Sequence, residues 1–265
     1  MPRDDAARLF AGAAEAYAAY RPGYPSELFD LMARKLAFTA DTAIADLGCG
    51  PGTASIPLAR RVGSVVAVDP NAEMLEVARA AAGRAGIGSI EFHQGHAEDL
   101  PKLEAGPVEH AVFGRSFHWT DRDAVVAMLD ELLPPHGAIV LLGSARTVAY
   151  PWDQAVRAVR ERFLGTERRA GSGTYSHPAV SHADLLVAGP FGAVEPYSFD
   201  EDVEYDLEYV LGLQRSYSHS AEHLFGERYG EFQAALREAV LAGCGPGPYP
   251  VVKQDTLIIA RRPGA

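Results

Sequence analysis

The stretch Ala45-Asp-Leu-Gly-Cys-Gly-Pro-Gly-Thr53 decides the fold of this 265-residue chain. The apolar run 42–47 predicts a buried strand before the glycines, and residues 53–61 predict a helix after them. Glycines at alternate positions let the backbone turn sharply and let a ligand lie against the main chain. A strand, a glycine-rich turn and a helix predict a nucleotide-binding half of a doubly wound sheet, where ligands bind at the carboxyl ends of the strands.

The spacing of Gly48, Gly50 and Gly52 is G-x-G-x-G, whereas dinucleotide sites have G-x-G-x-x-G. Asp46 stands two residues before the first glycine, where its carboxylate would repel a pyrophosphate. A ligand with an ammonium and a sulfonium group would tolerate this acid. The stretch resembles motif I of the class I S-adenosylmethionine (SAM) methyltransferases, which implies a SAM site.

Four further apolar runs alternate with predicted helices along the next part of the chain. They cover residues 64–69, 89–94, 109–114 and 137–142. The first of them is continuous and β-branched, which is typical of a parallel strand buried on both faces. With the run before the glycines they predict five parallel strands in a doubly wound arrangement.

The resemblance to class I methyltransferases implies two more strands, which form a reversed hairpin at the sheet edge. Residues 193–205 and 249–261 would supply them, and the residues between predict two helices, 206–224 and 227–241. We therefore expect an α/β fold: a doubly wound, Rossmann-like, mostly parallel seven-stranded sheet with a reversed C-terminal hairpin. The inserted helices would cover the catalytic edge as a lid.

We expect the whole chain, residues 1–265, to form a single class I methyltransferase domain. Its expected parts are an N-terminal helical arm over the cofactor (1–40), a SAM-binding core (41–145) and a C-terminal half (146–265) with a helical cap at about 206–242.

A histidine pair lies in the first predicted cap helix. His219 and His223 are four residues apart, so they would share one helix face and could bind a metal ion. Because no carboxylate or cysteine stands at a matching spacing, we expect no metal site.

The ends of the second and third predicted strands carry further cofactor candidates. Asp69 can accept hydrogen bonds from both hydroxyls of a ribose. Met74 lies one turn into the next helix, either near the adenine face or as core filler, which is the commoner role of methionine. In the resembling family the loop 95–101 contacts adenine, usually through an Asp where His96 stands here. His96 would replace that contact, or Glu98 would take it over and leave His96 as a surface residue.

The N-terminal segment carries the pattern Tyr17-x-x-Tyr20-Arg21-Pro22-x-Tyr24-Pro25. It resembles the N-terminal segment of small-molecule methyltransferases related to the trans-aconitate methyltransferases, in which it lies over the SAM pocket. Read without that resemblance, the prolines and glycine here indicate an exposed linker. The resemblance implies that Tyr20 and Arg21 contact SAM and that Tyr24 contacts the substrate.

The residues expected to bind SAM come from the glycine turn, the strand ends and the arm. They are Tyr20, Arg21, Asp46, Gly48, Cys49, Gly50, Gly52, Asp69, Pro70, Met74, His96, Ala97, Glu98 and Ser116. S-adenosylhomocysteine is the expected product.

The fourth predicted strand leads into Phe117-His118-Trp119, on a loop at the carboxyl edge of the sheet. A His-Trp pair there resembles the same subgroup, in which this loop lies opposite the sulfonium. We expect His118 to be the catalytic residue, which holds or deprotonates the acceptor, because its ordinary pKa of about 6.5 suits a base. Trp119 and Tyr217 are expected to bind the substrate. The alternative is a packed histidine beside a core tryptophan.

The composition of the chain limits the kinds of partner and the cellular setting that we expect. The net charge of −11 and the isoelectric point of about 5.3 argue against a broad nucleic-acid footprint. Cys49 and Cys244 are too few for a disulfide framework, which favours a reducing, cytoplasmic setting. We see no signal peptide and no long apolar run, and we therefore expect neither secretion nor a membrane span. We expect a monomer or a homodimer.

The sequence therefore predicts a SAM-dependent methyltransferase that acts on oxygen, nitrogen or carbon of a small molecule, with a carboxylic acid or a natural-product metabolite as the expected acceptor. The alternatives are a SAM-binding regulatory protein without catalysis, an RNA or protein methyltransferase, and a dinucleotide-dependent oxidoreductase.

Overall fold

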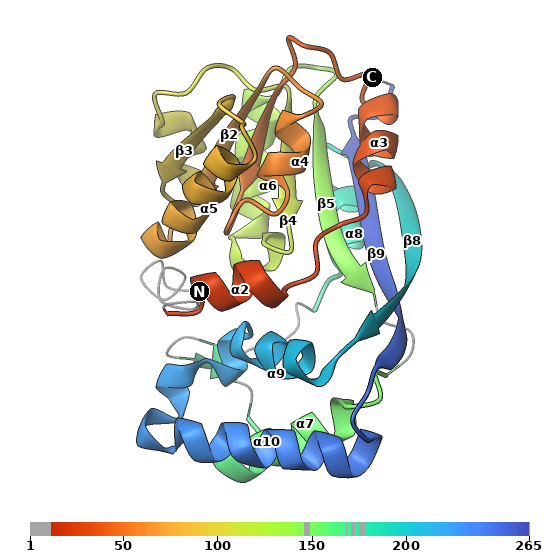
Figure 1. The fold of residues 1–265 in the computed structure, drawn as a ribbon. Coiled ribbons are helices and arrows are strands. Elements are labelled where there is room, and N and C mark those ends of the chain that lie inside the picture. The colour runs from red at the N-terminus through yellow and green to blue at the C-terminus, as the bar shows by residue number, and fades with distance from the viewer. Residues whose placement is uncertain (1–11, 146–148, 168, 171–172, 175–178, 265) are drawn as a thin grey trace.

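The main sheet has seven strands, and the computed structural model describes residues 12–145, 149–167, 169–170, 173–174 and 179–264. The strands are β1 (Ala43–Leu47), β2 (Ser64–Asp69), β3 (Ile90–Gln94), β4 (His110–Gly114), β5 (Ala138–Ala145), β8 (Ala193–Tyr205) and β9 (Tyr249–Arg261). Their order across the sheet is β3-β2-β1-β4-β5-β9-β8 (Figure 1). The first five are parallel, and β9 is antiparallel to both of its neighbours. The predicted fold is confirmed.

The helices alternate with these strands and then fill the segment between the last two. They are α2 (Ala14–Tyr20), α3 (Ser26–Lys35), α4 (Ser55–Ala59), α5 (Ala72–Arg84), α6 (Arg122–Leu132), α7 (Asp153–Leu164), α8 (His182–Ala188), α9 (Leu207–Arg215) and α10 (Tyr229–Cys244). Two short strands, β6 (Arg169–Ala170) and β7 (Gly173–Thr174), pair with each other. In the described part of the chain, no helix combines the length and the apolar character that a membrane span requires.

Both faces of the sheet are buried, as its β-branched strands predict. Ile44 of β1 packs in one core with Leu28 of α3 and Leu75 of α5. The next residue, Ala45, points to the other face and packs in a second core with Val125 of α6. Alternate side chains of a strand point to opposite faces, so one strand supplies both cores. This double cover leaves the carboxyl edge of the sheet as the open side.

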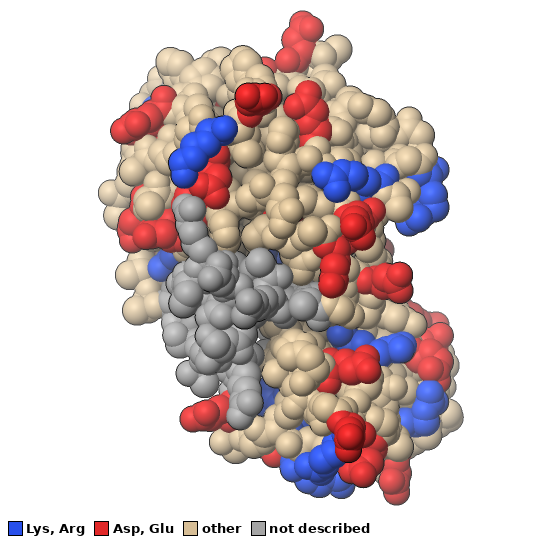
Figure 2. All heavy atoms as spheres, turned by 90° about the vertical axis from the view of Figure 1, so that its left-hand side faces the viewer, with Lys and Arg blue, Asp and Glu red and all other residues tan. Residues whose placement is uncertain are grey.

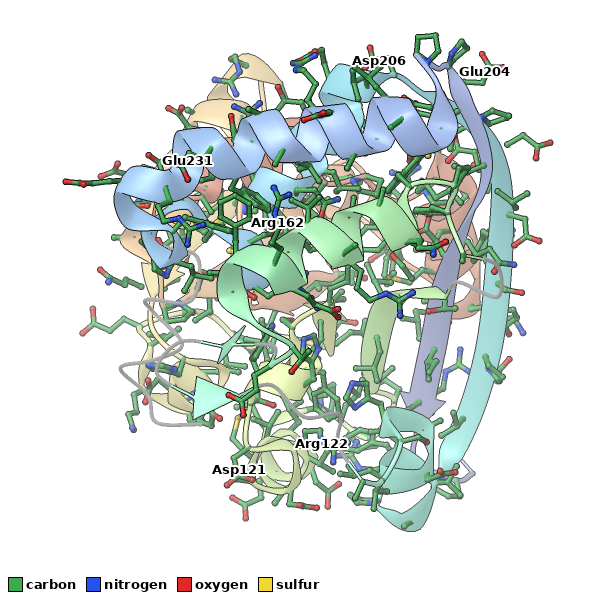
Figure 3. All side chains as sticks on the ribbon, turned by 90° about the horizontal axis from the view of Figure 1, so that it is seen from below. Asp121, Arg122, Arg162, Glu204, Asp206 and Glu231 are labelled. Carbon is green, nitrogen blue, oxygen red and sulfur yellow. The ribbon has the colours of Figure 1, made fainter. Side chains whose placement is uncertain are left out.

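A helical body, which we call the cap, lies below that edge. It consists of residues 149–164 and 206–248, and the long strands β8 and β9 reach down to it (Figure 1). Within it α7 and α10 lie side by side, as Figure 3 shows from below. The cap has a core of its own, built from Trp152, Val159, Val210, Phe232, Leu236 and Tyr249 among others. The helices predicted to form the lid therefore belong to a larger body that also includes α7.

The predicted helix 206–224 is wrong in its second half, because α9 ends at Arg215 and short 3₁₀ turns follow it. The hydroxyl of Ser216 donates to the Leu213 carbonyl at 2.6 Å, and that of Ser220 donates to the Gln214 carbonyl at 2.5 Å. Serine hydroxyls that bind helix carbonyls in this way compete with continuation of the helix. His219 and His223 therefore lie on separate 3₁₀ turns and not on one helix face.

Candidate functional site

The glycine turn after β1 adopts the backbone that its sequence predicts. Gly48, Gly50 and Gly52 have φ values of 72°, 54° and 85°, in the region that favours glycine. A Cβ on Gly48 would be 2.4 Å from the Cβ of Ser116, so this position also requires glycine for close approach. The hydroxyl of Ser116 donates to the Leu47 carbonyl at 2.5 Å. The turns after β1 and β4 are thus held together at the carboxyl edge.

Three cavities lie along this edge, and we call them the middle, small and large cavities. The middle cavity has a volume of about 100 Å³ and lies between the glycine turn and the ends of β2 and β3. Nine of the predicted cofactor residues line it: Gly48, Gly50, Asp69, Pro70, Met74, His96, Ala97, Glu98 and Ser116.

Asp69, at the end of β2, ties the glycine turn to the start of α5. Its Oδ2 accepts the amide of Gly50 at 2.8 Å, and its Oδ1 accepts the amide of Asn71 at 2.9 Å. Burial raises the pKa of Asp69, while these two amide bonds act in the opposite direction. Each carboxylate oxygen keeps a second lone pair for a hydroxyl group of a ligand.

The small cavity, of about 20 Å³, lies on the other side of the glycine turn and is lined by Asp46 and Tyr24. Asp46 is fully buried and its Oδ2 accepts the hydroxyl of Ser55 at 2.5 Å, but its Oδ1 has no hydrogen-bond partner in the described structure. Burial raises the pKa of Asp46 to about 7, although the Ser55 hydrogen bond opposes this. The buried Tyr24 hydroxyl also has no partner with hydrogen-bonding geometry in that part of the chain. An unpaired buried acceptor and donor here suit the ammonium and carboxylate of an amino acid.

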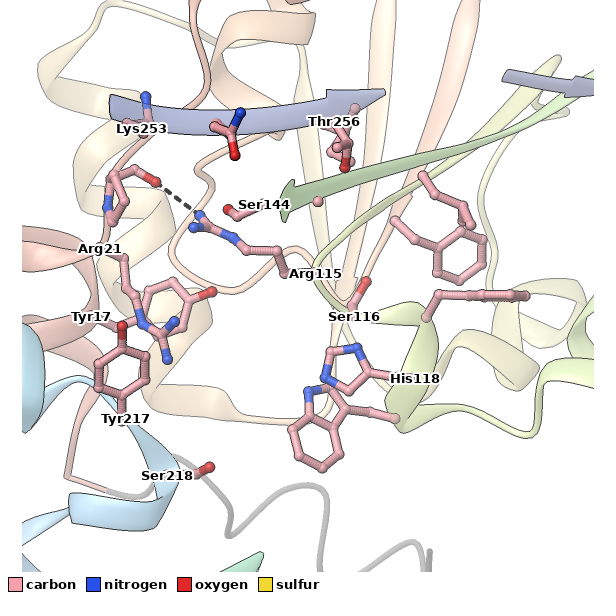
Figure 4. Close-up of a pocket in the computed structure, with 18 of the residues that line it drawn as sticks. Tyr17, Arg21, Arg115, Ser116, His118, Ser144, Tyr217, Ser218, Lys253 and Thr256 are labelled. Carbon is pink, nitrogen blue, oxygen red and sulfur yellow. Dashed lines mark hydrogen bonds between the residues drawn. The ribbon is translucent and has the colours of Figure 1, made fainter. Parts of the chain in front are cut away.

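The large cavity has a volume of about 580 Å³ and lies between the sheet edge, the arm and the cap (Figure 4). The 3₁₀ turn Phe117–Trp119 forms one side of it. Phe117 is buried, and its ring centre lies 5.0 Å from that of Phe113; this packing anchors the turn. His118 and Trp119 line the cavity with their rings 4.5 Å apart, and Tyr217 lines it from the cap.

The middle and large cavities share a wall. Tyr17, Arg115, Ser116 and Trp119 line both of them. A molecule in the middle cavity would therefore face a second molecule in the large cavity at these residues.

Other predicted site residues do not line the middle cavity. Gly52 and Tyr20 do not line any of the three cavities, and Tyr20 packs against α9 instead. Cys49 and Tyr24 line the small cavity, and Tyr24 does not line the large cavity. Of the three cavities, Arg21 lines only the large one and neither of the two beside the glycine turn. The arm crosses the sheet edge between the cavities, and its path decides which of them each residue reaches.

Tyr17 and Arg115 line all three cavities, although neither is among the residues that the sequence predicts for the site. Arg115 has a φ of 59°, which is uncommon for a residue other than glycine and is often found at functional sites. Its Nη2 donates to the Pro22 carbonyl at 3.0 Å, and its guanidinium lies 4.8 Å from the ring centre of Tyr24. Tyr17 belongs to the quoted N-terminal pattern, which was the signal that could have found it.

Residues 44–137 match the methyltransferase domain family. An uncharacterised methyltransferase of Mycobacterium tuberculosis is 32% identical over 150 residues, which are 57% of this chain and 58% of that protein. Nocamycin O-methyltransferase of Saccharothrix syringae is 32% identical over 175 residues, which are 63% of this chain and 61% of that protein. The chain thus covers less than two thirds of the length of these relatives.

A solved structure agrees with the fold over nearly the whole chain. It is a SAM-dependent methyltransferase from Geobacter sulfurreducens in complex with S-adenosylhomocysteine, with a TM-score of 0.52, 18% identity and coverage of 96% of this chain and 98% of that one. The fold of this chain is therefore Rossmann-like, as in that methyltransferase. The part of this chain that matches the methyltransferase domain family, residues 44–137, includes β1 to β4 and the glycine turn.

Proposed function

We propose that the protein is a SAM-dependent methyltransferase that acts on a small molecule held in the large cavity. The shared wall of Tyr17, Arg115, Ser116 and Trp119 carries this proposal. A cofactor in the middle and small cavities would present its reactive group to an acceptor across that wall. Alignment of the two reactants and exclusion of water are the main demands of such a transfer.

The residues present fit SAM at both ends. We assign the ribose hydroxyls to Asp69, and the adenine to the space beside Met74 and Ala97 in the middle cavity. The unpaired Oδ1 of Asp46 would accept the ammonium, and Tyr24 would donate to the carboxylate, in the small cavity. The Geobacter protein of the same fold holds S-adenosylhomocysteine, which supports this assignment.

His118 is our candidate for the residue that acts on the acceptor. It lines the large cavity on the turn after β4, next to the shared wall. SAM supplies a methyl group on a sulfonium, which is already a good leaving group. An acceptor hydroxyl, amine or acidic carbon would give up its proton to His118 as it attacks the methyl carbon, while a carboxylate acceptor needs no base and would only be positioned.

The charge distribution supports a small acceptor over a nucleic acid. The net charge is −11, and Figure 2 shows basic and acidic side chains interspersed on the face that it presents. A nucleic-acid site would need clustered Lys and Arg. The large cavity is covered by the arm and the cap, which suits a molecule that can be enclosed. The naming of one relative as nocamycin O-methyltransferase and the resemblance of the N-terminal pattern to trans-aconitate methyltransferases support the same choice.

The proposal is tested in two steps. Calorimetry should show binding of SAM and S-adenosylhomocysteine and no binding of NAD(H). Methyl-labelled SAM should then transfer its label to at least one member of a panel of carboxylic acids, phenols, indoles and 2-oxo acids. SAM binding without label transfer to any acceptor would favour the regulatory SAM-binding alternative, and failure to bind SAM would contradict the proposal.

A further inference from the structure

We propose that Arg21 anchors an anionic group of the acceptor, so that the acceptor carries a carboxylate or another planar oxyanion. This inference rests on the proposed function and changes the role that the N-terminal pattern predicts for Arg21. That pattern assigns Arg21 to the cofactor, yet among the three cavities Arg21 lines only the large one.

The guanidinium of Arg21 is held between two aromatic rings. Its Cζ lies 4.9 Å from the ring centre of Tyr17, in the arm, and 4.0 Å from that of Tyr217, in the cap (Figure 4). Stacking on aromatic rings occupies the faces of a guanidinium and leaves its edge for hydrogen bonds. A planar oxyanion that approaches along this edge can accept two parallel N–H bonds.

The edge of Arg21 is largely unused within the protein. One Nη2 bond to the Ser216 carbonyl, at 3.3 Å, is its single hydrogen bond to the described residues, and its Nε is buried without a partner there. No carboxylate of those residues forms an ion pair with it. A guanidinium has five N–H donors, so several remain for a ligand.

Among the described residues that line the large cavity, the other Lys and Arg side chains are Lys253 and Arg115. Lys253 forms ion pairs with Glu201 at 2.8 Å and with Asp255 at 3.0 Å, which neutralise its charge. Arg115 donates to the Pro22 carbonyl and, like Arg21, has a buried Nε without a partner among the described residues, but it also borders the small cavity, where we place the methionine carboxylate of SAM. Of these three described side chains, Arg21 is the one that has no ion pair with a described residue and lines the large cavity but neither of the other two, so we assign the second anion to it.

The rest of the cavity indicates what the anion is attached to. Phe113, Leu141 and Ile258 line it together with the His118 turn. In Figure 4 Arg21 and His118 lie on opposite sides of the open space. The acceptor that fits is an organic acid with an apolar or aromatic body, which lies between the two.

The test compares acids with their matched amides in protein saturated with S-adenosylhomocysteine. The probes are benzoate and benzamide, indole-3-acetate and indole-3-acetamide, and hexanoate and hexanamide. We expect wild-type protein to prefer at least one acid over its amide. Arg21→Gln should weaken binding of that acid by about 10- to 100-fold, as expected for loss of a charge-assisted hydrogen bond, and leave the amide and S-adenosylhomocysteine affinities unchanged.

Arg215→Gln is the matched control. Arg215 also stacks on a tyrosine of the arm, with its Cζ 5.3 Å from the Tyr20 ring centre, and donates to the Tyr20 hydroxyl at 3.3 Å. It does not line the three cavities, so its loss should leave the preference for the acid intact.

Three results would overturn the anchor. One is a tenfold or greater loss of S-adenosylhomocysteine affinity in Arg21→Gln with the acid preference intact, which would return Arg21 to the cofactor. The second is an equal loss of acid preference in both variants, which would make Arg21 a contact between arm and cap only. The third is a wild-type protein that prefers no acid over its amide. Failure of wild-type protein to bind S-adenosylhomocysteine would instead contradict the proposed function itself.

Discussion

The ring of Tyr20 lies so close to the backbone of Gly212 that a Cβ at position 212 would be 2.3 Å from the Cδ1 and Cε1 atoms of that ring. Tyr20 ends helix α2 of the arm, and Gly212 lies within helix α9 of the cap. The missing side chain at position 212 therefore lets the arm dock on the cap. This docking places Tyr17, three residues earlier, where the three cavities meet.

Gly212→Ala should loosen the arm, because a methyl group cannot fit beneath the Tyr20 ring without displacing it. Overpacking of this kind costs about 1–3 kcal/mol of unfolding free energy, despite the better helix propensity of alanine. We expect lower turnover and faster amide exchange in residues 14–20, measured by hydrogen-exchange mass spectrometry. Gly230→Ala in α10 is the control, since a Cβ there meets no atom within 4 Å. It should stabilise the protein by up to about 1 kcal/mol. Equal behaviour of the two variants would show that the contact with Tyr20 does not hold the arm.

Asp69→Ala should weaken SAM binding by about 1–3 kcal/mol, the usual cost of losing hydrogen bonds to a charged group. The loss combines the ribose contacts with the bond from the Gly50 amide, which shapes the glycine turn. Calorimetry measures it, and circular dichroism checks that the variant is folded. Glu76→Ala is the control, because Glu76 is an exposed acid in helix α5; this variant should bind SAM normally. Unchanged SAM affinity in Asp69→Ala would exclude the ribose assignment.

Asp46 should make SAM binding depend on pH. Burial raises its pKa to about 7 in the ligand-free protein, so the carboxyl is mostly protonated below that pH. An ammonium group beside it favours the carboxylate, so binding releases a proton and affinity should rise between pH 5 and 7, by at most about tenfold per pH unit. Calorimetry in buffers of different ionisation enthalpy counts the released protons. Asp46→Asn should remove this dependence. A wild-type affinity that is flat over the same range would contradict the ammonium assignment.

The same residue should affect stability. Because the folded-state pKa of Asp46 lies above its ordinary value of 3.8, the native protein binds more protons than the unfolded chain between about pH 4 and 7. The contribution of Asp46 to the unfolding free energy therefore falls as pH rises through this window. Denaturant titrations of ligand-free wild-type protein and Asp46→Asn should diverge with pH over this range and run parallel above it.

His118→Ala should lower turnover with little change in SAM affinity. If His118 is a general base, the loss should be about 10²- to 10⁴-fold. If it positions a carboxylate acceptor, the loss should be smaller and the pH profile flat near neutrality. His136→Ala is the comparison, because His136 is exposed, pairs through its Nε2 with Glu109 at 3.4 Å and lines none of the three cavities. Normal specific activity in the folded fraction of His118→Ala would return His118 to a packing role.

Most of the sheet could be predicted from the sequence because its signals are local. The strands β8 and β9 begin and end at the residues that the sequence predicts, 193–205 and 249–261. The path of the chain after α9 was less predictable. There the hydroxyls of Ser216 and Ser220 donate to carbonyls of α9, and the helix does not continue. That choice depends on burial of both serines in the folded protein.

The sequence by itself determined the doubly wound sheet, the glycine turn and the acids at the ends of β1 and β2, because these features depend on neighbouring residues along the chain. Only the tertiary structure decided how the arm crosses the sheet edge. As a result, Tyr24 lines the small cavity and Arg21 lines the large one. The contact that holds Arg21, from its Nη2 to the Ser216 carbonyl, joins residues 195 positions apart. A contact over that separation arises from the docking of the cap on the arm, and no local pattern in the sequence encodes it.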